Sequence, residues 1–371
     1  MTMNGARVGL VYFMLLVFTM LQGCSTQAKW KGSVVKEGDI TVIKNPKEPI
    51  YKTPILELKE DLSLGGPDAK GDLFFSMITA VVIDDAGAIY VLDYRSSNIK
   101  VFDSSGALLQ TIGRRGQGPG ELEMPLDLSF VRTTGELAVH QMTRRMSFFK
   151  TDGTFLRHLL YKDVRAGRGL CDSRGNIFIT EVRREDKESR YVIKKLSADG
   201  TIMATFADSP APSGDKFNPF MPFGSFQIDT GDNLIYGYPE SYEIQFFGAS
   251  DAKLFKKIVR EYEPVAVKAE ERAEQEKSAQ GRGIVFDFSK FHPAYRRFFL
   301  SDLGHLFVET FEKAKDGKII HDIFDPEGRF IGRVPLKGLS FGVFKDKYYA
   351  REDDEDGYQY LKRYALTWLV K

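Results

Sequence analysis

The sequence predicts an all-β fold, built as a ring of six similar four-stranded units. Its 29 Phe, 16 Tyr and 34 Gly favour short strands joined by tight turns over long helices. A pattern of four apolar strands separated by polar turns recurs along the chain, and the first turns of its six copies contain Gly87, Gly135, Gly175, Asn233, Gly304 and Asp346. These turns are roughly 40 to 70 residues apart, which fits propeller blades of about 40–50 residues with insertions in the longer intervals. The predicted architecture is therefore a six-bladed β-propeller with four-stranded blades.

The first copy shows why each unit is predicted to be a blade. Its apolar runs cover 79–83, 88–93, 99–103 and 107–112, and each is short and bounded by turn residues. Gly87 and Gly106 end the two polar turns and supply the positive φ that tight hairpins need. A solenoid of stacked helices would instead show a 3.6-residue period throughout each repeat, and this sequence does not.

The two ends of the chain are predicted to meet in the sixth blade. The sixth copy has no room for a clear fourth strand before Lys371, whereas Thr53–Leu58 reads as a strand just ahead of the first full blade. We expect this N-terminal strand to pair near Tyr360–Ala365 and to close the ring, because closure hides exposed strand edges. The propeller would then span residues 51–371 as one domain.

The first residues are predicted to be a signal peptide that is not part of the fold. An apolar run from Val8 to Met20 is too short for a permanent membrane helix but suits a signal peptide. The run ends in Leu21-Gln22-Gly23-Cys24, which resembles a bacterial lipobox. The resemblance implies cleavage after residue 23 and lipid attachment at Cys24; the alternative is an ordinary signal peptide with an incidental cysteine. Residues 24–50 are then a polar tether and N-terminal extension, and the protein is an extracytoplasmic, membrane-anchored lipoprotein facing the periplasm or the cell surface.

One Gly-rich segment carries a family resemblance. Residues 112–122, with the sequence IGRRGQGPGEL, follow a first blade of the form IYVLD…IKVFD…G. Residues 293–297 and 302–308 add a second match in the fifth blade. Over roughly residues 50–370 the chain resembles bacterial six-bladed β-propeller lipoproteins related to NHL-repeat proteins. The resemblance implies a fold and a location, and it transfers no catalytic residue.

The candidate ligand-binding residues lie on the predicted loop-rich face. Because the strands of a blade alternate in direction, all the long segments fall on one face, where function concentrates on loops. Arginines gather in the loops of blades one to three, and Arg side chains suit carboxylate, sulfate and phosphate groups. The candidates are Arg114, Arg115, Gln117, Glu121, Arg144 and Arg145. They would bind an anionic glycan or peptide, or a protein partner in the envelope; alternatively, the Gly-rich loop only fastens blade one to blade two.

Other chemistry is not indicated by the sequence. Lys+Arg 52 against Asp+Glu 51 gives a net charge of +1, which provides no electrostatic basis for nucleic-acid binding. The five His have no close zinc-ligand spacing, and the acidic run Glu352–Asp356 lacks the spacing of a calcium loop. No cofactor or metal site is therefore predicted, and no catalytic residue is named. Residues 265–280 are predicted to form a surface helix within an insertion at about 263–296.

Two classes of function remain open at this point. A non-catalytic binding module that uses the loop-rich face is favoured, because the sequence contains no recognisable catalytic set. The alternative is a propeller enzyme of the lyase or lactonase/hydrolase type, with a site at the channel mouth that could require a metal.

Overall fold

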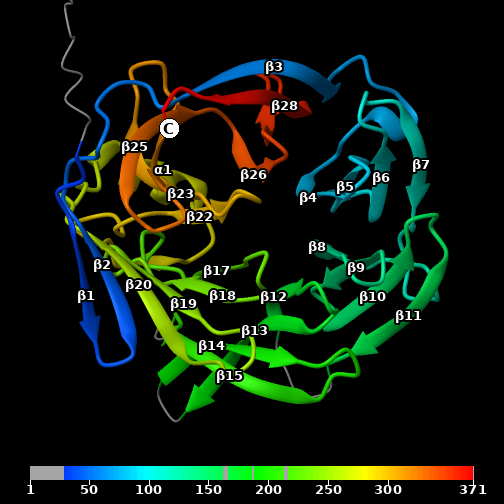
Figure 1. Ribbon diagram of the computed structural model, residues 1–371. Helices are drawn as coiled ribbons and strands as arrows, with labels where there is room; N and C mark the ends of the chain where they lie inside the picture. The colour runs from blue at the N-terminus through cyan, green and yellow to red at the C-terminus, as the bar shows by residue number, and fades with distance from the viewer. Residues whose placement is uncertain (1–28, 162–165, 186–187, 213–215, 371) are drawn as a thin grey trace, which may run out of the picture.

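Six β-sheets surround a central axis, as Figure 1 shows. The structure is a computed structural model, and it describes residues 29–161, 166–185, 188–212 and 216–370. Neighbouring strands of a blade run antiparallel, and in the first five blades the four strands follow the order of the chain from the axis outward. The predicted six-bladed, all-β architecture is confirmed. The predicted signal peptide and Cys24 lie outside the described residues.

Each blade contains four consecutive strands, except that the last one borrows its outer strand. Blades one to three comprise β4 (Ile78–Ile83), β5 (Ile89–Asp93), β6 (Asn98–Phe102) and β7 (Leu108–Ile112); β8 (Pro125–Val131), β9 (Glu136–Gln141), β10 (Arg145–Lys150) and β11 (Phe155–Leu160); and β12 (Ala166–Cys171), β13 (Ile177–Glu185), β14 (Glu188–Leu196) and β15 (Ile202–Pro210). Blades four to six comprise β17 (Ser225–Ile228), β18 (Leu234–Gly237), β19 (Glu243–Phe247) and β20 (Leu254–Arg260); β22 (Arg297–Leu300), β23 (Leu306–Lys313), β24 (Ile319–Phe324) and β25 (Phe330–Leu336); and β26 (Leu339–Phe344), β27 (Lys347–Asp353), β28 (Gln359–Trp368) and β3 (Leu56–Gly65).

An aspartate organises many of the tight turns. The Asp84 carboxylate accepts the backbone N–H of Ala88 at 2.8 Å, and Asp172 does the same for Asn176. The intervening Gly87 has φ +90°, which a side chain would disfavour. In blade four, where that glycine is missing, Asp232 takes the positive φ instead. Aspartate is a residue that tolerates this conformation, so the turn survives the change.

Six apolar clusters, one at each boundary between neighbouring blades, form the core. Between blades four and five, for example, Ile244 and Ile258 pack against Phe298 and Phe324. Blades six and one are joined in the same way, with Tyr349 and Leu361 in one cluster with residues of the first blade. Burying each such side chain contributes about 1.5–3 kcal/mol, so the ring is held mainly by contacts between blades.

The outer strand of blade six comes from the N-terminal part of the chain. β3 pairs antiparallel with β28 along its length, and Arg363 Nε donates to Asp61 Oδ1 at 2.7 Å. The observed strand starts at Leu56 and runs on to Gly65, beyond the predicted Thr53–Leu58. The prediction ended too early because residues 59–61 are all charged, which an outer strand facing solvent accommodates.

The expectation of a polar tether is wrong for residues 33–45. They form the hairpin of β1 (Ser33–Glu37) and β2 (Ile40–Asn45), and β2 pairs in parallel with β20, so the sheet of blade four has six strands. Val42 and Ile43 are buried, and this burial offsets the cost of ordering the segment.

The insertion between blades four and five contains the predicted helix. α1 (Ala269–Ser278) lies within the expected 265–280, and β21 (Val285–Phe286) pairs in parallel with β16 (Lys216–Phe217). A single 3₁₀ turn, η1 (Gly71–Leu73), precedes blade one. None of the helices in the described ranges is long and apolar enough to cross a membrane.

Candidate functional site

The Gly-rich loop between β7 and β8 is held together by its own Glu121. One Glu121 carboxylate oxygen accepts the Gly118 N–H at 2.9 Å, and the other accepts Nε of Arg114 at 3.0 Å. These two hydrogen bonds, the first from Gly118, lower the pKa of Glu121 below its usual value. Gly116 has φ +154°, which L side chains rarely adopt, and a Cβ there would also displace the Glu121 carboxylate that holds the loop together.

Arg145 fastens this loop to blade two. It is buried, and its guanidinium donates to the carbonyl of Gln117 at 2.8 Å and to Gln141 Oε1 at 2.8 Å. A longer bond of 3.3 Å reaches the Glu121 carbonyl. Both terminal nitrogens of Arg145 therefore already have acceptors inside the protein, as expected of a residue that fastens a loop connecting two blades.

The other predicted residues lie at the surface. The Arg114 side chain is 81% exposed despite its contact with Glu121, and Arg144 is exposed with a positive φ. Arg115 donates to the Arg95 carbonyl at 2.6 Å, and Gln117 donates to Glu123 at 3.0 Å. The structure thus brings the six predicted residues into one region but gives them two roles. Glu121 and Arg145 hold the Gly-rich loop in place through hydrogen bonds, whereas the other four residues lie at the surface.

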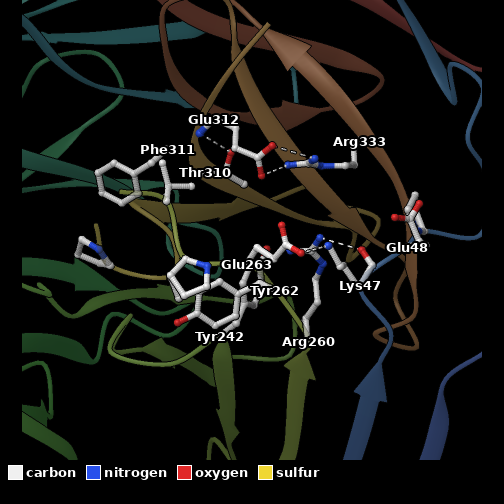
Figure 2. A pocket seen from close by; sticks show the side chains of 15 residues that line it. Lys47, Glu48, Tyr242, Arg260, Tyr262, Glu263, Thr310, Phe311, Glu312 and Arg333 are labelled. Carbon is white, nitrogen blue, oxygen red and sulfur yellow. Dashed lines mark hydrogen bonds and ion pairs between the residues drawn. The ribbon is translucent and has the colours of Figure 1, made fainter. Parts of the chain in front are cut away.

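A cavity of about 340 Å³ lies between blades four and five on the loop-rich face (Figure 2). Its walls come from segments that are distant in the sequence: the link after β2, the ends of β20 and β23, the connection to blade five, and β25. The lining residues are Lys47, Glu48, Pro49, Tyr242, Arg260, Tyr262, Glu263, Pro264, Val265, Pro293, Ala294, Thr310, Phe311, Glu312 and Arg333.

The buried Asp322 organises the floor of this cavity. Its carboxylate accepts hydrogen bonds from the Tyr242 hydroxyl at 2.7 Å and from Nε of Arg333 at 2.8 Å, and it forms an ion pair with Nη1 of Arg260 at 3.0 Å. Burial, together with the Asp322 charge, raises the pKa of the Tyr242 hydroxyl well above its usual value, so the hydroxyl stays a donor. Arg260 also donates to the Lys47 carbonyl at 3.0 Å. The floor therefore joins both blades and the N-terminal link in one fixed network.

The rim holds two ion pairs that are open to solvent. Arg333 presents both terminal nitrogens to Glu312, at 2.6 and 3.1 Å, in a bidentate contact that Figure 2 shows. Across the cavity Lys47 pairs with Glu263, whose side chain is 78% exposed. Although burial acts in the opposite direction, the contacts with Glu312 and Asp322 raise the pKa of Arg333. Exposed pairs of this kind contribute at most about 1 kcal/mol, so a ligand can exchange with either partner.

This cavity was not predicted from the sequence. Arg260 is the last residue of β20 and Arg333 lies in the middle of β25, and no local motif marks either of them. The only available signal in the sequence is the long connection after β20, which the alternating strand directions place on the loop-rich face.

The histidines are engaged in packing or hydrogen bonds. The fully buried His140 contacts the Gly167 carbonyl at 3.1 Å, and His292 contacts Glu271 at 3.1 Å. Among the described residues, no three His, Cys, Asp or Glu side chains are grouped so that they could hold a metal ion. Cys171 is buried, and burial raises the pKa of its thiol.

The fold and this face define a six-bladed β-propeller with one elaborated side. Residues 69–287 match the model of the DUF5128 family, described as a 6-bladed beta-propeller, and the chain belongs to this family. No curated protein matches the chain.

Solved structures are similar to this chain at low sequence identity. A protein of Bacteroides fragilis NCTC 9343 that is inferred to be exported is 16% identical, with a TM-score of 0.59 over 88% of this chain and 99% of that one. A DUF4221 family member from Bacteroides vulgatus is 11% identical, with a TM-score of 0.49 over 84% and 98% of the two chains. Virginiamycin B lyase from Staphylococcus aureus is 12% identical, with a TM-score of 0.42 over 84% and 100%. At 16% identity, the similarity to the Bacteroides fragilis protein concerns the fold and not the activity.

Proposed function

We propose that the protein is an extracytoplasmic, lipid-anchored binding protein whose ligand occupies the cavity between blades four and five. One observation carries the proposal: two exposed ion pairs border a cavity whose floor is a buried polar network centred on Asp322. A fixed floor keeps the polar groups in place before the ligand arrives, which lowers the entropy cost of binding. The exposed rim can change partners without disturbing the floor.

The ligand group that fits this rim is a carboxylate. Glu312 occupies the planar fork of Arg333 in the bidentate geometry that a ligand carboxylate would adopt. The aromatic ring of Tyr262 and three prolines line the remaining wall and offer apolar contact. An acidic peptide and a glycan with a uronic acid both carry the required group, so the experiment has to separate them.

The Gly-rich loop lies across the ring from this cavity. In Figure 1 the connection from β7 to β8 and the pair of β20 and β25 stand on opposite sides of the axis. A ligand that touches both regions would have to span the face, so we treat Arg114 and Arg115 as a separate contact for an anionic group.

Calorimetry with purified residues 25–371 tests the proposal, using arrays of acidic peptides and of uronic-acid oligosaccharides as probes. Glu312→Gln removes the competing carboxylate and should tighten binding roughly three- to tenfold. Arg333→Gln should weaken it at least tenfold, with the melting temperature followed because Arg333 also holds Asp322. Asp85→Asn is the matched control, since Asp85 belongs to an exposed ion pair with Arg132 in a tight turn of blade one.

The outcomes separate the candidate functions. If the Glu312→Gln variant and the unmodified protein bound the probes with equal affinity, the cavity between blades four and five would be rejected as the binding site. Binding of only one array would assign the ligand to peptides or to glycans. Conversion of any probe into product would replace the binding function with an enzyme of the lyase or hydrolase type.

The lipid anchor rests on the sequence around Cys24 and has its own test. Cys24→Ala should give an unlipidated protein that is released in the soluble fraction with its fold intact, because the propeller begins well after this residue. Membrane fractionation after a salt wash, with the unmodified precursor as control, measures this. Retention of the variant in the membrane fraction would reject the lipobox.

A further inference from the structure

Both tryptophans of the chain line one large cavity at the outer corner of blade five. The cavity has a volume of about 880 Å³ and is lined by Trp30, Trp368, Tyr51 and His305 together with charged residues of the turn between β24 and β25. This turn lies at the opposite end of β25 from the loop-rich face, so the cavity is distinct from the one in Figure 2. Its volume lies in the upper part of the usual range of about 300–1,000 Å³ for small-molecule sites.

The aromatic rings that border this cavity are fixed in place. Nε1 of Trp30 donates to Asn45 Oδ1 at 3.0 Å, and Trp368 stacks on His305 with ring centroids 4.3 Å apart. The link after β2 runs along β25, where the Tyr51 N–H donates to the Ile331 carbonyl at 2.9 Å. Trp30 and Trp368 both remain partly exposed. The cavity therefore has rigid aromatic surfaces that need no rearrangement to receive a ligand.

The charged residues of the cavity balance one another. Nε of Arg329 donates to Asp325 at 2.6 Å, and its Nη2 donates to Glu327 at 3.0 Å. Lys29 adds a second positive charge, so the lining holds two basic and two acidic residues. Such a lining gives no net attraction to an ion. It nevertheless presents planar donors and acceptors side by side, which is what vicinal hydroxyl groups require.

We infer that this cavity binds a neutral oligosaccharide. A pyranose ring has an apolar C–H face that packs on an indole and a periphery of hydroxyls that hydrogen-bond to carboxylates and guanidinium groups. Trp30 and Trp368 supply the surfaces, and Arg329 with Glu327 supplies the polar contacts. This inference is independent of the proposed function, because none of these residues lines the cavity between blades four and five.

The test uses the two tryptophans as reporters, since no other residue of the chain contributes indole emission. Purified residues 25–371 are titrated with a panel of neutral hexasaccharides: maltohexaose, cellohexaose, laminarihexaose, xylohexaose and mannohexaose. At least one should shift the emission in a saturable manner. Trp368→Ala should then weaken that binding at least tenfold, measured through Trp30 and by calorimetry, and Trp368→Phe should retain most of it.

Two further variants keep the inference falsifiable if Trp368→Ala fails to fold. Glu327→Gln, at a side chain that is 66% exposed, should weaken binding several-fold without changing the melting temperature. Glu312→Gln in the other cavity should leave it unchanged. The inference is overturned if no hexasaccharide binds. It is also overturned if Trp368→Ala, Trp368→Phe and Glu327→Gln all bind the sugar as tightly as the unmodified protein does. A lysophospholipid that displaces the sugar and binds more tightly would overturn it as well.

Discussion

Arg114 and Arg145 belong to the same loop region, yet their surroundings give them different roles. Arg145→Ala would remove the donor to the carbonyl of Gln117 and one of the two donors to Gln141 Oε1, and it would leave a gap where the buried guanidinium packed; we expect it to lower the free energy of unfolding by about 2–4 kcal/mol. The double variant Arg114→Ala/Arg115→Ala should leave stability nearly unchanged and weaken binding of an anionic ligand at least tenfold. Urea unfolding and calorimetry measure the two effects. Loss of stability in the double variant, without any change in binding, would make the Gly-rich loop a blade connector only.

Two buried histidines make stability depend on pH. Burial lowers the pKa of His140 and His321, against the opposing charges of Asp127 and Glu309. Each stays neutral in the folded protein at a pH where the unfolded chain, with a usual histidine pKa near 6.5, already binds a proton. The contribution of the two neutral histidines to the free energy of unfolding is therefore complete above about pH 6.5. It is lost as the pH falls from this value toward the lower pKa that each histidine has in the folded protein.

We expect the free energy of unfolding to decline between pH 7.5 and 5.0, by at most about 1.4 kcal/mol per pH unit for each histidine. The carboxylates with lowered pKa, such as Asp208 and Glu271, act only below about pH 4.5, so the two ranges separate. Urea unfolding at several pH values measures the decline. His140→Gln combined with His321→Gln should make the decline less steep and leave the part due to His305, whose pKa burial also lowers. Equal stability of the unmodified protein at pH 5.0 and 7.5 would contradict the assignment.

At the scale of elements, Asn45 decides where the N-terminal hairpin docks. It is buried at the end of β2, where its Oδ1 accepts the Phe330 N–H at 2.8 Å and its Nδ2 donates to the Gly328 carbonyl at 2.9 Å. Asn45→Ala leaves both groups of blade five without these partners, so we expect a loss of about 2–3 kcal/mol. Hydrogen exchange of residues 33–45 should rise while the other blades stay protected, with Asn176→Ala in a turn of blade three as control. A uniform rise over all blades would show that the hairpin is not a separate unit.

The sequence predicted those elements whose signal is local. The Asp-to-Gly turns, such as Asp84 to Gly87, recur with the blades because each is a short self-contained set of hydrogen bonds. The hairpin β1–β2 was missed although Gly38 marks its turn, since its burial depends on β20, which lies more than 200 residues away. The cavity around Asp322 was missed for the same reason: Arg260, Arg333 and Lys47 meet only once the ring exists.

At the scale of the whole molecule, stability depends on an unbroken ring of apolar clusters. The cluster between blades five and six contains Ile55 and Leu56 from the N-terminal segment together with Phe307 and Ile323 from blade five. Ile55 is fully buried and packs so closely on Gly332 that a Cβ there would lie 2.6 Å from its side chain. Removing the closing strand would therefore open this cluster and also leave the edge of β28 unpaired.

Two truncations separate the closing strand from the hairpin. A chain that begins at Asp61 lacks the first half of β3 together with Ile55 and Leu56, each of which contributes about 1.5–3 kcal/mol on burial. We expect it to lose cooperative unfolding and to aggregate. A chain that begins at Pro46 lacks only β1 and β2, so it should unfold cooperatively at a lower temperature, because β20 becomes an edge strand as in an ordinary blade. Calorimetric melting and size-exclusion chromatography compare both with residues 25–371. If the chain beginning at Asp61 melted cooperatively at the temperature of the longer protein, the β3–β28 pairing would not be what holds the ring closed.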